Sequence, residues 1–202
     1  MTTFLFVRHA VTSHTGARLS GWMPGIHLSE RGRAQAEAVA ETLAEAPIAA
    51  VYSSPIDRTM ETARAIARHH GVKVVRSEAL GEVRYGTWTD RSLKSLARTK
   101  LWGTVQRFPS AARFPGGETL AEVQARAIAE VQRLRAVHPK GTLCCVSHAD
   151  VIKLIAAHYL GVHIDLFQRI VVSPASLTAI AIGDLGPAVL AVNASDLRHL
   201  KG

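Results

Sequence analysis

Chemically active residues follow several short apolar runs in this sequence. Arg8 and His9 come first, and Arg58, Glu82 and His148 follow later in the chain. Guanidinium groups bind phosphoryl oxygens, a neutral imidazole can attack phosphorus, and a carboxylic acid can protonate a leaving oxygen. If the fold brings these side chains together, they have the composition of a phosphoryl-transfer site.

The apolar runs before these residues predict the strands that would position them. Phe4–Val7, Ile48–Ser53 and Thr142–Val146 are short and apolar, which is typical of buried strands. In an open α/β sheet, ligands bind outside the carboxyl ends of the strands. The arginine–histidine pair directly follows the first run, and a serine–histidine pair directly follows the third. We therefore expect these residues at one rim of a sheet.

Helix starts are predicted from N-cap residues. The candidates are Ser29, Ser54, Thr119 and Ser147. The last three are followed, three residues later, by an acidic residue at the spacing of a capping box. Arg58 then falls in the first turn of its helix, beside unpaired backbone N–H groups that attract anions. On the same grounds, Asp150 is interpreted as a capping residue rather than a metal ligand.

The alternation of strands and helices predicts an α/β fold. We expect three layers, α/β/α, around a mostly parallel sheet. Leu177–Ile182 and Ala188–Val192 flank a tight turn and predict an antiparallel hairpin at its edge. The length of 202 residues, with no linker or repeat, favours one domain over residues 1–202. Within it, segment 84–117 is expected to cover the site, and Ser92–Phe108 to form one basic helix.

The net charge of +8 allows nucleic acid, acidic membrane or small anionic partners. Between Arg84 and Arg113 seven basic residues accompany one acidic residue, Asp90. No nucleic-acid-binding motif accompanies this segment, so a small phosphorylated ligand is favoured and neither nucleic acid nor membrane is expected. The excess of basic residues suggests a second negative group on the substrate.

The sequence also predicts a compartment. No apolar run is long enough to span a membrane, and the start of the chain lacks the pattern of a signal peptide. Cys144 and Cys145 are adjacent, so a disulfide between them is not expected. These features predict a cytoplasmic protein. A homodimer formed through an edge strand is left open.

Five segments together resemble the histidine phosphatase superfamily, whose fold is that of phosphoglycerate mutase. They are Val7–Thr12 (Val-Arg-His-Ala-Val-Thr), Tyr52–Ala63, Leu80–Trp88, Phe114–Thr119 and Ser147–His148. Their order is the family's order, which is far more specific than any one motif. Partly through Leu166–Ser176, the chain most resembles a group described as probable phosphomutases.

The resemblance implies a role for each matching residue. His9 would be the nucleophile that becomes phosphohistidine, and Glu82 would be the proton donor. Arg8, Arg58 and His148 would complete the catalytic group. The implied substrate-binding residues are Arg8, Thr15, Gly21, Arg58, His148 and Ala149. No metal and no cofactor is implied, because the cations come from the protein itself.

Some positions depart from the family pattern. Ala10 and Ala149 stand where glycine is common, and each adds only a methyl group. Thr15 stands where many members carry asparagine, and its hydroxyl group can also donate a hydrogen bond to phosphate.

Three functions are compatible with these residues. The favoured one is a metal-independent phosphomonoester hydrolase acting on small phosphorylated metabolites. The second is a cofactor-dependent phosphomutase, which returns the phosphoryl group to its substrate. Mutases of this family carry a longer insertion before the late helix, and a longer tail over the site, than this chain has. This difference favours the hydrolase. The third is a phospholigand-binding protein without turnover, which would not need a nucleophile and an acid.

Overall fold

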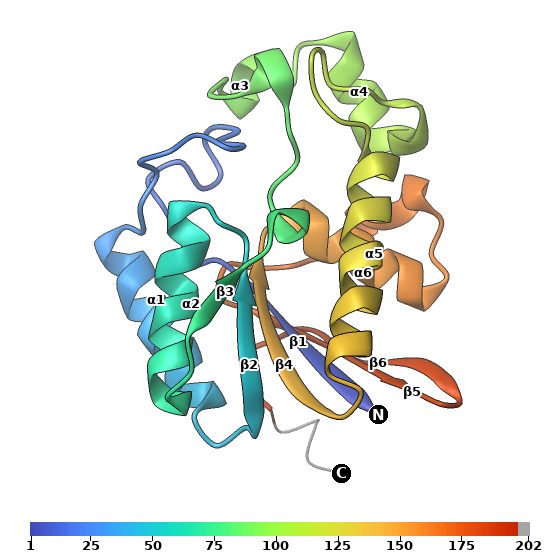
Figure 1. The fold of residues 1–202 in the computed structure, drawn as a ribbon. Coiled ribbons are helices and arrows are strands. Elements are labelled where there is room, and N and C mark those ends of the chain that lie inside the picture. Colours follow the sequence, from blue (N-terminus) through green and yellow to red (C-terminus); the bar gives the residue numbers. More distant parts are fainter. Residues whose placement is uncertain (198–202) are drawn as a thin grey trace.

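The computed structural model describes residues 1–197 and places them around one six-stranded sheet (Figure 1). The strands are β1 (Thr2–Arg8), β2 (Ile48–Ser53), β3 (Val74–Arg76), β4 (Gly141–Ser147), β5 (Leu177–Gly183) and β6 (Gly186–Ala194). Their order in the sheet is β3-β2-β4-β1-β5-β6. The first four are parallel neighbours, while β5 is antiparallel to both β1 and β6. The predicted parallel sheet with an antiparallel hairpin at its edge is confirmed.

Helices cover both faces of the sheet. They are α1 (Glu30–Leu43), α2 (Asp57–His70), α3 (Leu93–Leu96), α4 (Lys100–Arg107), α5 (Leu120–Val137) and α6 (Ala149–Leu160), with short 3₁₀ turns η1 (Glu78–Leu80), η2 (Gly86–Trp88), η3 (Pro109–Ala111) and η4 (Ile164–Arg169). Helices α1 and α2 pack on one face, and α5 and α6 on the other (Figure 1). This is the predicted three-layer α/β/α arrangement.

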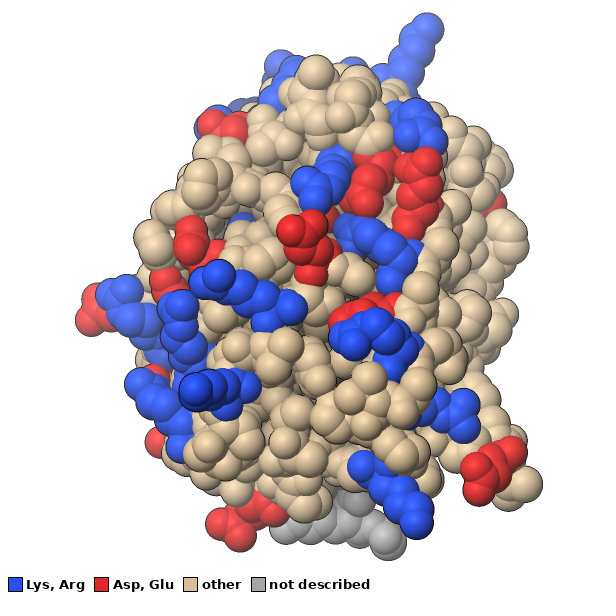
Figure 2. All heavy atoms as spheres, viewed as in Figure 1, with Lys and Arg blue, Asp and Glu red and all other residues tan. Residues whose placement is uncertain are grey.

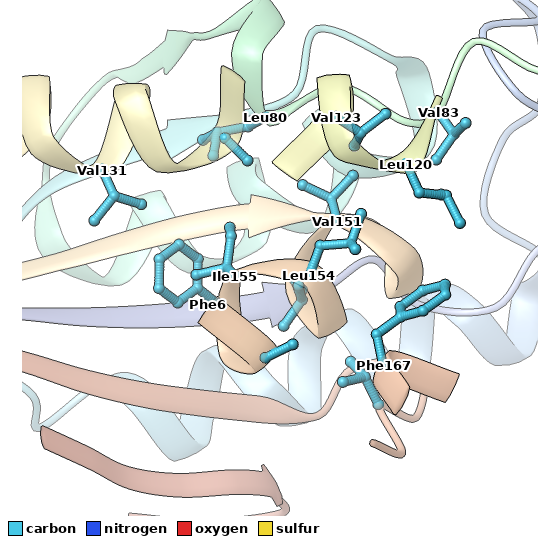
Figure 3. Close-up of a cluster of buried hydrophobic side chains, with 14 of the residues drawn as sticks. Phe6, Leu80, Val83, Leu120, Val123, Val131, Val151, Leu154, Ile155 and Phe167 are labelled. Carbon is cyan, nitrogen blue, oxygen red and sulfur yellow. The ribbon is translucent and has the colours of Figure 1, made fainter. Parts of the chain in front are cut away.

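The core beneath α5 and α6 also supports the segment that carries Glu82. Figure 3 shows Leu80 and Val83, which flank that glutamate, close to apolar side chains of α5 such as Val123. Both flanking side chains are fully buried. Burial of these apolar side chains is favourable, and the protein interior around them is closely packed. This packing fixes the backbone on either side of the carboxylate.

Two of the predicted helix caps are confirmed. Ser29 caps α1 by accepting from the N–H of Gly32, and Thr119 forms a full capping box with Glu122 at the start of α5. Both hydroxyl groups accept from an N–H group in the first turn of their helix, as N-cap residues commonly do.

The other two predicted caps are wrong. Helix α2 has Ile56 as its N-cap and α6 has His148, and neither N-cap residue makes a side-chain capping bond. The Ser54 hydroxyl lies 2.9 Å from His148 Nε2, and the Ser147 hydroxyl donates to the carbonyl of Leu80 at 2.6 Å. These buried tertiary partners replace the local one.

The predicted single basic helix over 92–108 is also wrong, because the segment forms α3 and α4 with a break between them. Thr99 begins a new helix by accepting from the N–H of Trp102. Backbone hydrogen bonds join this segment to the first loop, including Leu93 N to the Ala17 carbonyl. Figure 1 shows α3 and α4 beyond the edge of the sheet at which β2 and β4 end and α2 and α6 begin.

The turn after Glu82 depends on a glycine, which gives a test of the fold. Gly86 has φ +55°, and a Cβ there would lie 2.0 Å from the carbonyl oxygen of Pro115. We expect Gly86→Ala to lower the free energy of unfolding by roughly 2–5 kcal/mol, from left-handed backbone strain plus overpacking.

The matched control is Gly116→Ala, at φ +70° with no atom within 4 Å of the added Cβ. It should cost only about 1–2 kcal/mol, from the backbone strain alone. Urea unfolding of both variants measures the difference. Equal losses would show that the contact with Pro115 does not restrict the turn.

Candidate active site

The fold brings the five predicted catalytic residues to one end of the sheet. Arg8 is the last residue of β1, and His9 follows it. His148 lies between β4 and α6, and Arg58 lies in the first turn of α2. Since β1 and β2 both pair with β4, these residues start from neighbouring strands. Glu82 joins them from the loop after η1.

A cavity of about 310 Å³ lies at this site. Its walls include four of the five residues, namely Arg8, His9, Arg58 and Glu82. His148 is not part of the wall and is fully buried behind it. A volume of this size is at the lower end of the range for small-ligand pockets.

The His9 ring is held as a neutral imidazole with one unprotonated nitrogen. Its Nδ1 lies 2.8 Å from the carbonyl oxygen of Ala10, which accepts a hydrogen bond and so fixes the proton on Nδ1. The other nitrogen, Nε2, accepts from Arg58 Nε at 3.3 Å. Burial, and then the charge of Arg58, hold the pKa of His9 well below its usual value. The ring therefore keeps the lone pair on Nε2 that a nucleophile requires.

One buried guanidinium group, that of Arg58, and one half-buried group, that of Arg8, leave N–H donors unused. Arg58 is 2% exposed, and its Nη2 donates to the Gly21 carbonyl at 2.9 Å. Arg8 donates through Nη1 to the Val172 carbonyl at 2.7 Å. Arg8 Nε and Arg58 Nη1 are buried without a hydrogen-bond partner in residues 1–197. Because unpaired buried donors are costly, the pair is suited to receive an anion.

His148 is held by two polar side chains, those of Ser54 and Arg58. Its Nε2 lies 2.9 Å from Ser54 Oγ, and its Nδ1 lies 3.3 Å from Arg58 Nη2. Because a guanidinium can only donate, Nδ1 must be the acceptor and Nε2 carries the proton. Burial and the Arg58 charge lower the pKa of His148 well below its usual value. Its ring meets that of His9 edge-on, with centroids 5.2 Å apart.

Glu82 has the opposite shift. Its side chain is 12% exposed, and its Oε2 lies 3.6 Å from His148 Nδ1 and 4.0 Å from Arg58 Nη2. Burial, and then the charge of Asp150, raise its pKa to about 7, although Arg58 and the Val83 N–H act in the other direction. A carboxyl group with this pKa can give and take a proton near neutral pH.

Two residues that sequence reasoning missed hold the backbone of Glu82. Its carbonyl oxygen accepts from Trp22 Nε1 at 2.6 Å and from Arg126 Nη2 at 3.0 Å. Arg126 also donates to the carbonyls of Ala79 and Gly81. It lies in the middle of α5, so no local pattern in the sequence pointed to it.

The three remaining predicted substrate-binding residues differ in their positions. Thr15 and Ala149 line the cavity. The Thr15 hydroxyl accepts from the N–H of Thr12 at 2.9 Å, which ties the loop after His9 together. Gly21 is not among the lining residues, and its carbonyl accepts from Arg58. Its position suits it to hold the arginine rather than to contact a ligand.

The covering segment presents apolar side chains to the cavity. Leu93, Trp102, Val105 and Phe114 line the wall, together with the amide of Gln106. The basic residues Arg91, Lys94, Arg98, Lys100 and Arg107 of this segment are exposed and are not among the lining residues. The basic residues of this segment therefore do not support the prediction of a second negative group, because short amphipathic helices turn their charges to solvent. That prediction is untested.

Basic residues gather elsewhere on the surface too. Figure 2 shows lysine and arginine side chains over the side of the molecule that carries α2 and β3. Arg64, Arg68, Lys73 and Arg76 contribute to a shallow depression there. Much of the positive charge is thus spread over solvent-exposed surface and does not face the site.

Comparison with known proteins places this chain in one family. Residues 4–195 match the histidine phosphatase superfamily (branch 1). The chain belongs to this superfamily, which confirms the family and the fold predicted from the sequence. Among residues 1–197 no helix is long and apolar enough to cross a membrane, and no group of three His, Cys, Asp or Glu side chains is arranged to hold a metal ion.

Particular relatives match over nearly the whole chain. Phosphoserine phosphatase 1 of Hydrogenobacter thermophilus is 28% identical, over 96% of this chain and 92% of its own. A Photorhabdus laumondii protein named "Probable phosphoglycerate mutase GpmB" is 25% identical, over 99% and 95%. The solved structure of YhfR from Bacillus stearothermophilus has a TM-score of 0.89 at 25% identity, with all of both chains covered.

The unused donors of the two arginines lead to a test of anion binding. We expect inorganic phosphate to raise the melting temperature of the wild-type protein, because a ligand that binds only the folded state stabilises it. Arg58→Met should abolish most of that rise. The melting temperature of the unliganded variant should fall, because the Gly21 carbonyl and the rings of His9 and His148 each lose a buried donor. The phosphate effect is therefore measured as the rise above each protein's own unliganded value.

Differential scanning calorimetry with and without phosphate measures both effects. The control is Arg64→Met, an exposed arginine on the same helix, which should keep the full response to phosphate. A rise in Arg58→Met equal to that of the wild type would show that phosphate does not bind at this guanidinium.

Proposed function

We propose that this protein is a metal-independent phosphomonoester hydrolase that acts on small phosphorylated metabolites through a phosphohistidine at His9. The observation that carries the proposal is that an imidazole, a guanidinium and a carboxyl group converge in the same cavity. A neutral imidazole nitrogen and a carboxyl group with a pKa of about 7 lie on either side of one buried guanidinium. Membership of the histidine phosphatase superfamily supports the same chemistry.

In the first step, the lone pair on His9 Nε2 attacks phosphorus and the bond to the leaving oxygen breaks. Glu82 gives its proton to that oxygen, so the product leaves as a neutral alcohol and the carboxylate remains. The free donors of Arg8 and Arg58 stabilise the charge on the phosphoryl oxygens. Such positioned cations supply much of the catalysis in phosphoryl transfer.

In the second step, the Glu82 carboxylate removes a proton from a water molecule that attacks the phosphohistidine. The bond between phosphorus and Nε2 breaks, and its electron pair returns to the ring. Phosphate leaves, and both His9 and Glu82 are back in their starting protonation states. His148 donates or accepts no proton in this scheme, and we infer that it holds Arg58 in position from behind the cavity wall.

A phosphomutase would share the first step and differ in the second. The phosphohistidine would then pass its phosphoryl group to a substrate hydroxyl group instead of to water. The relative from Photorhabdus laumondii carries a mutase name, and the relative from Hydrogenobacter thermophilus a phosphatase name. Release of inorganic phosphate from a monophosphate substrate separates the two reactions.

The nucleophile is tested by removing its ring. We expect His9→Ala to fold normally and to lower kcat by on the order of 10³-fold or more, as the loss of a covalent nucleophile does in other enzymes. Phosphate release should be measured in EDTA with an aryl phosphate, O-phosphoserine and 3-phosphoglycerate as substrates. Acid-labile phosphate on the protein should appear in the wild type and be missing in the variant.

The matched control is His69→Ala, an exposed histidine at the end of α2, which should keep full activity. Near wild-type hydrolysis by His9→Ala would rule out the covalent mechanism. A label from a bisphosphorylated glycerate without release of phosphate from any monophosphate would favour the mutase.

The acid is tested through the leaving group and the pH. Because the pKa of Glu82 is raised to about 7, its protonated form dominates below that pH and is lost above it. We expect kcat/KM for an alkyl phosphate to fall as the pH rises through about 7, and Glu82→Gln to remove this dependence. The variant should lose about 10²–10⁴-fold on alkyl phosphates and much less on an aryl phosphate with an acidic leaving group.

The measurement is a pH profile of kcat/KM for both substrates in both proteins. The second ionisation of a phosphate ester, near pH 6, affects only the acidic side of such a profile. Equal losses for the two kinds of leaving group would exclude proton donation by Glu82.

A further inference from the structure

The cavity contains a second charged pair that the proposed hydrolysis does not require. Asp150 and Lys153 both line the wall and both come from the start of α6. Lys153 Nζ lies 3.5 Å from Asp150 Oδ1 and donates to Gln168 Oε1 at 3.0 Å. The Tyr85 hydroxyl lies 3.4 Å from Asp150 Oδ2. The pair is thus held in place on both sides.

Burial separates this pair from an ordinary ion pair on a helix. Charges three residues apart on an exposed helix surface are common and contribute only a few tenths of a kcal/mol. Here the side chain of Lys153 is 16% exposed and that of Asp150 is 25% exposed. Removing charges from water is costly even when they are paired. A pair held in a cavity wall at that cost suggests a role in binding a ligand.

The arrangement of the two charges defines what the pair can bind. A ligand group with only a negative charge would be attracted by Lys153 but repelled by Asp150, 3.5 Å away. A group with only a positive charge would meet the reverse problem. A group that carries both charges side by side can align each with its opposite, so both interactions are favourable.

The smallest common group of this kind is the α-carbon of an amino acid, which carries an ammonium and a carboxylate. We propose that Asp150 and Lys153 select an O-phosphorylated amino acid, with Asp150 accepting from its ammonium group and Lys153 donating to its carboxylate. This inference rests on the proposed function, since the phosphoryl group is assigned to Arg8, Arg58 and His9. The small, partly apolar cavity suits a short side chain between the two ends.

Three compounds of similar size separate the contribution of the ligand's ammonium group from that of its carboxylate. O-Phosphoserine carries both, 3-phosphoglycerate has a hydroxyl group in place of the ammonium group, and phosphoethanolamine lacks the carboxylate. We expect kcat/KM of the wild-type protein to be highest for O-phosphoserine, by about tenfold or more over either analogue. The difference should lie mainly in KM, because the subsite is remote from the reacting bond.

Two substitutions should each remove one half of the selectivity. Asp150→Asn should lower the preference for O-phosphoserine over 3-phosphoglycerate by about tenfold, because an amide cannot offset the ammonium charge. Lys153→Met should lower the preference over phosphoethanolamine by a similar factor. Lys94→Met, on the exposed side of the covering segment, is the matched control and should leave both preferences unchanged.

Ratios within one protein separate selection from general loss, because any effect of Asp150 on the proton donor is common to the three substrates. A uniform loss for all three in Asp150→Asn would overturn the subsite, and so would a wild-type protein that prefers 3-phosphoglycerate.

Binding to His9→Ala, measured by calorimetry, tests the subsite without turnover. Tighter binding of O-phosphoserine than of 3-phosphoglycerate, lost in the double variant with Asp150→Asn, would establish it even if the wild-type protein hydrolysed none of these compounds. In that case the proposed function alone would fail. Equal binding of the two compounds would overturn the subsite whether or not the protein is a phosphatase.

Discussion

The site depends on the contacts that the Arg58 guanidinium makes. It is almost fully buried, and it contacts His9, His148 and the Gly21 carbonyl. A buried cation costs free energy that only good partners offset. The three partners come from β1, from the junction of β4 and α6, and from the first loop, so one side chain ties the ends of the sheet to the loop above them. Its remaining N–H groups are left for an anion.

Burial also explains how a neutral imidazole and a protonated carboxyl group can coexist here. Loss of water disfavours whichever form of a group is charged. It therefore lowers the pKa of the His9 imidazole and raises the pKa of the Glu82 carboxyl group in the same cavity. Both groups are then largely uncharged on the acidic side of neutrality, which is the state that attack on phosphorus with proton donation requires.

The sequence was sufficient for the parts of the fold that depend on local pattern. The apolar strands, the hairpin and the Thr119 cap depend on periodicity and nearest neighbours, and they are confirmed. The predicted caps at Ser54 and Ser147 have the same local spacing, yet their hydroxyl groups bind His148 and the Leu80 carbonyl. A local pattern cannot show that a distant partner competes for the same atom. The roles of the site residues came from five motifs in family order, and their proximity follows from strand ends that meet at one rim.

The roles of some residues could not be predicted from local sequence patterns, and the physical reason is the same for each of them. Arg126 reaches the backbone around Glu82 from the middle of a helix, and its neighbours in the sequence give no sign of this contact. Asp150 and Lys153 have the spacing of any surface ion pair on a helix. What distinguishes them is burial in the cavity wall, a property of the packed chain. Most of the proposed catalytic groups lie where strands end and were predicted from pattern, whereas the residues proposed to select a substrate are ordinary in sequence and are defined by what surrounds them.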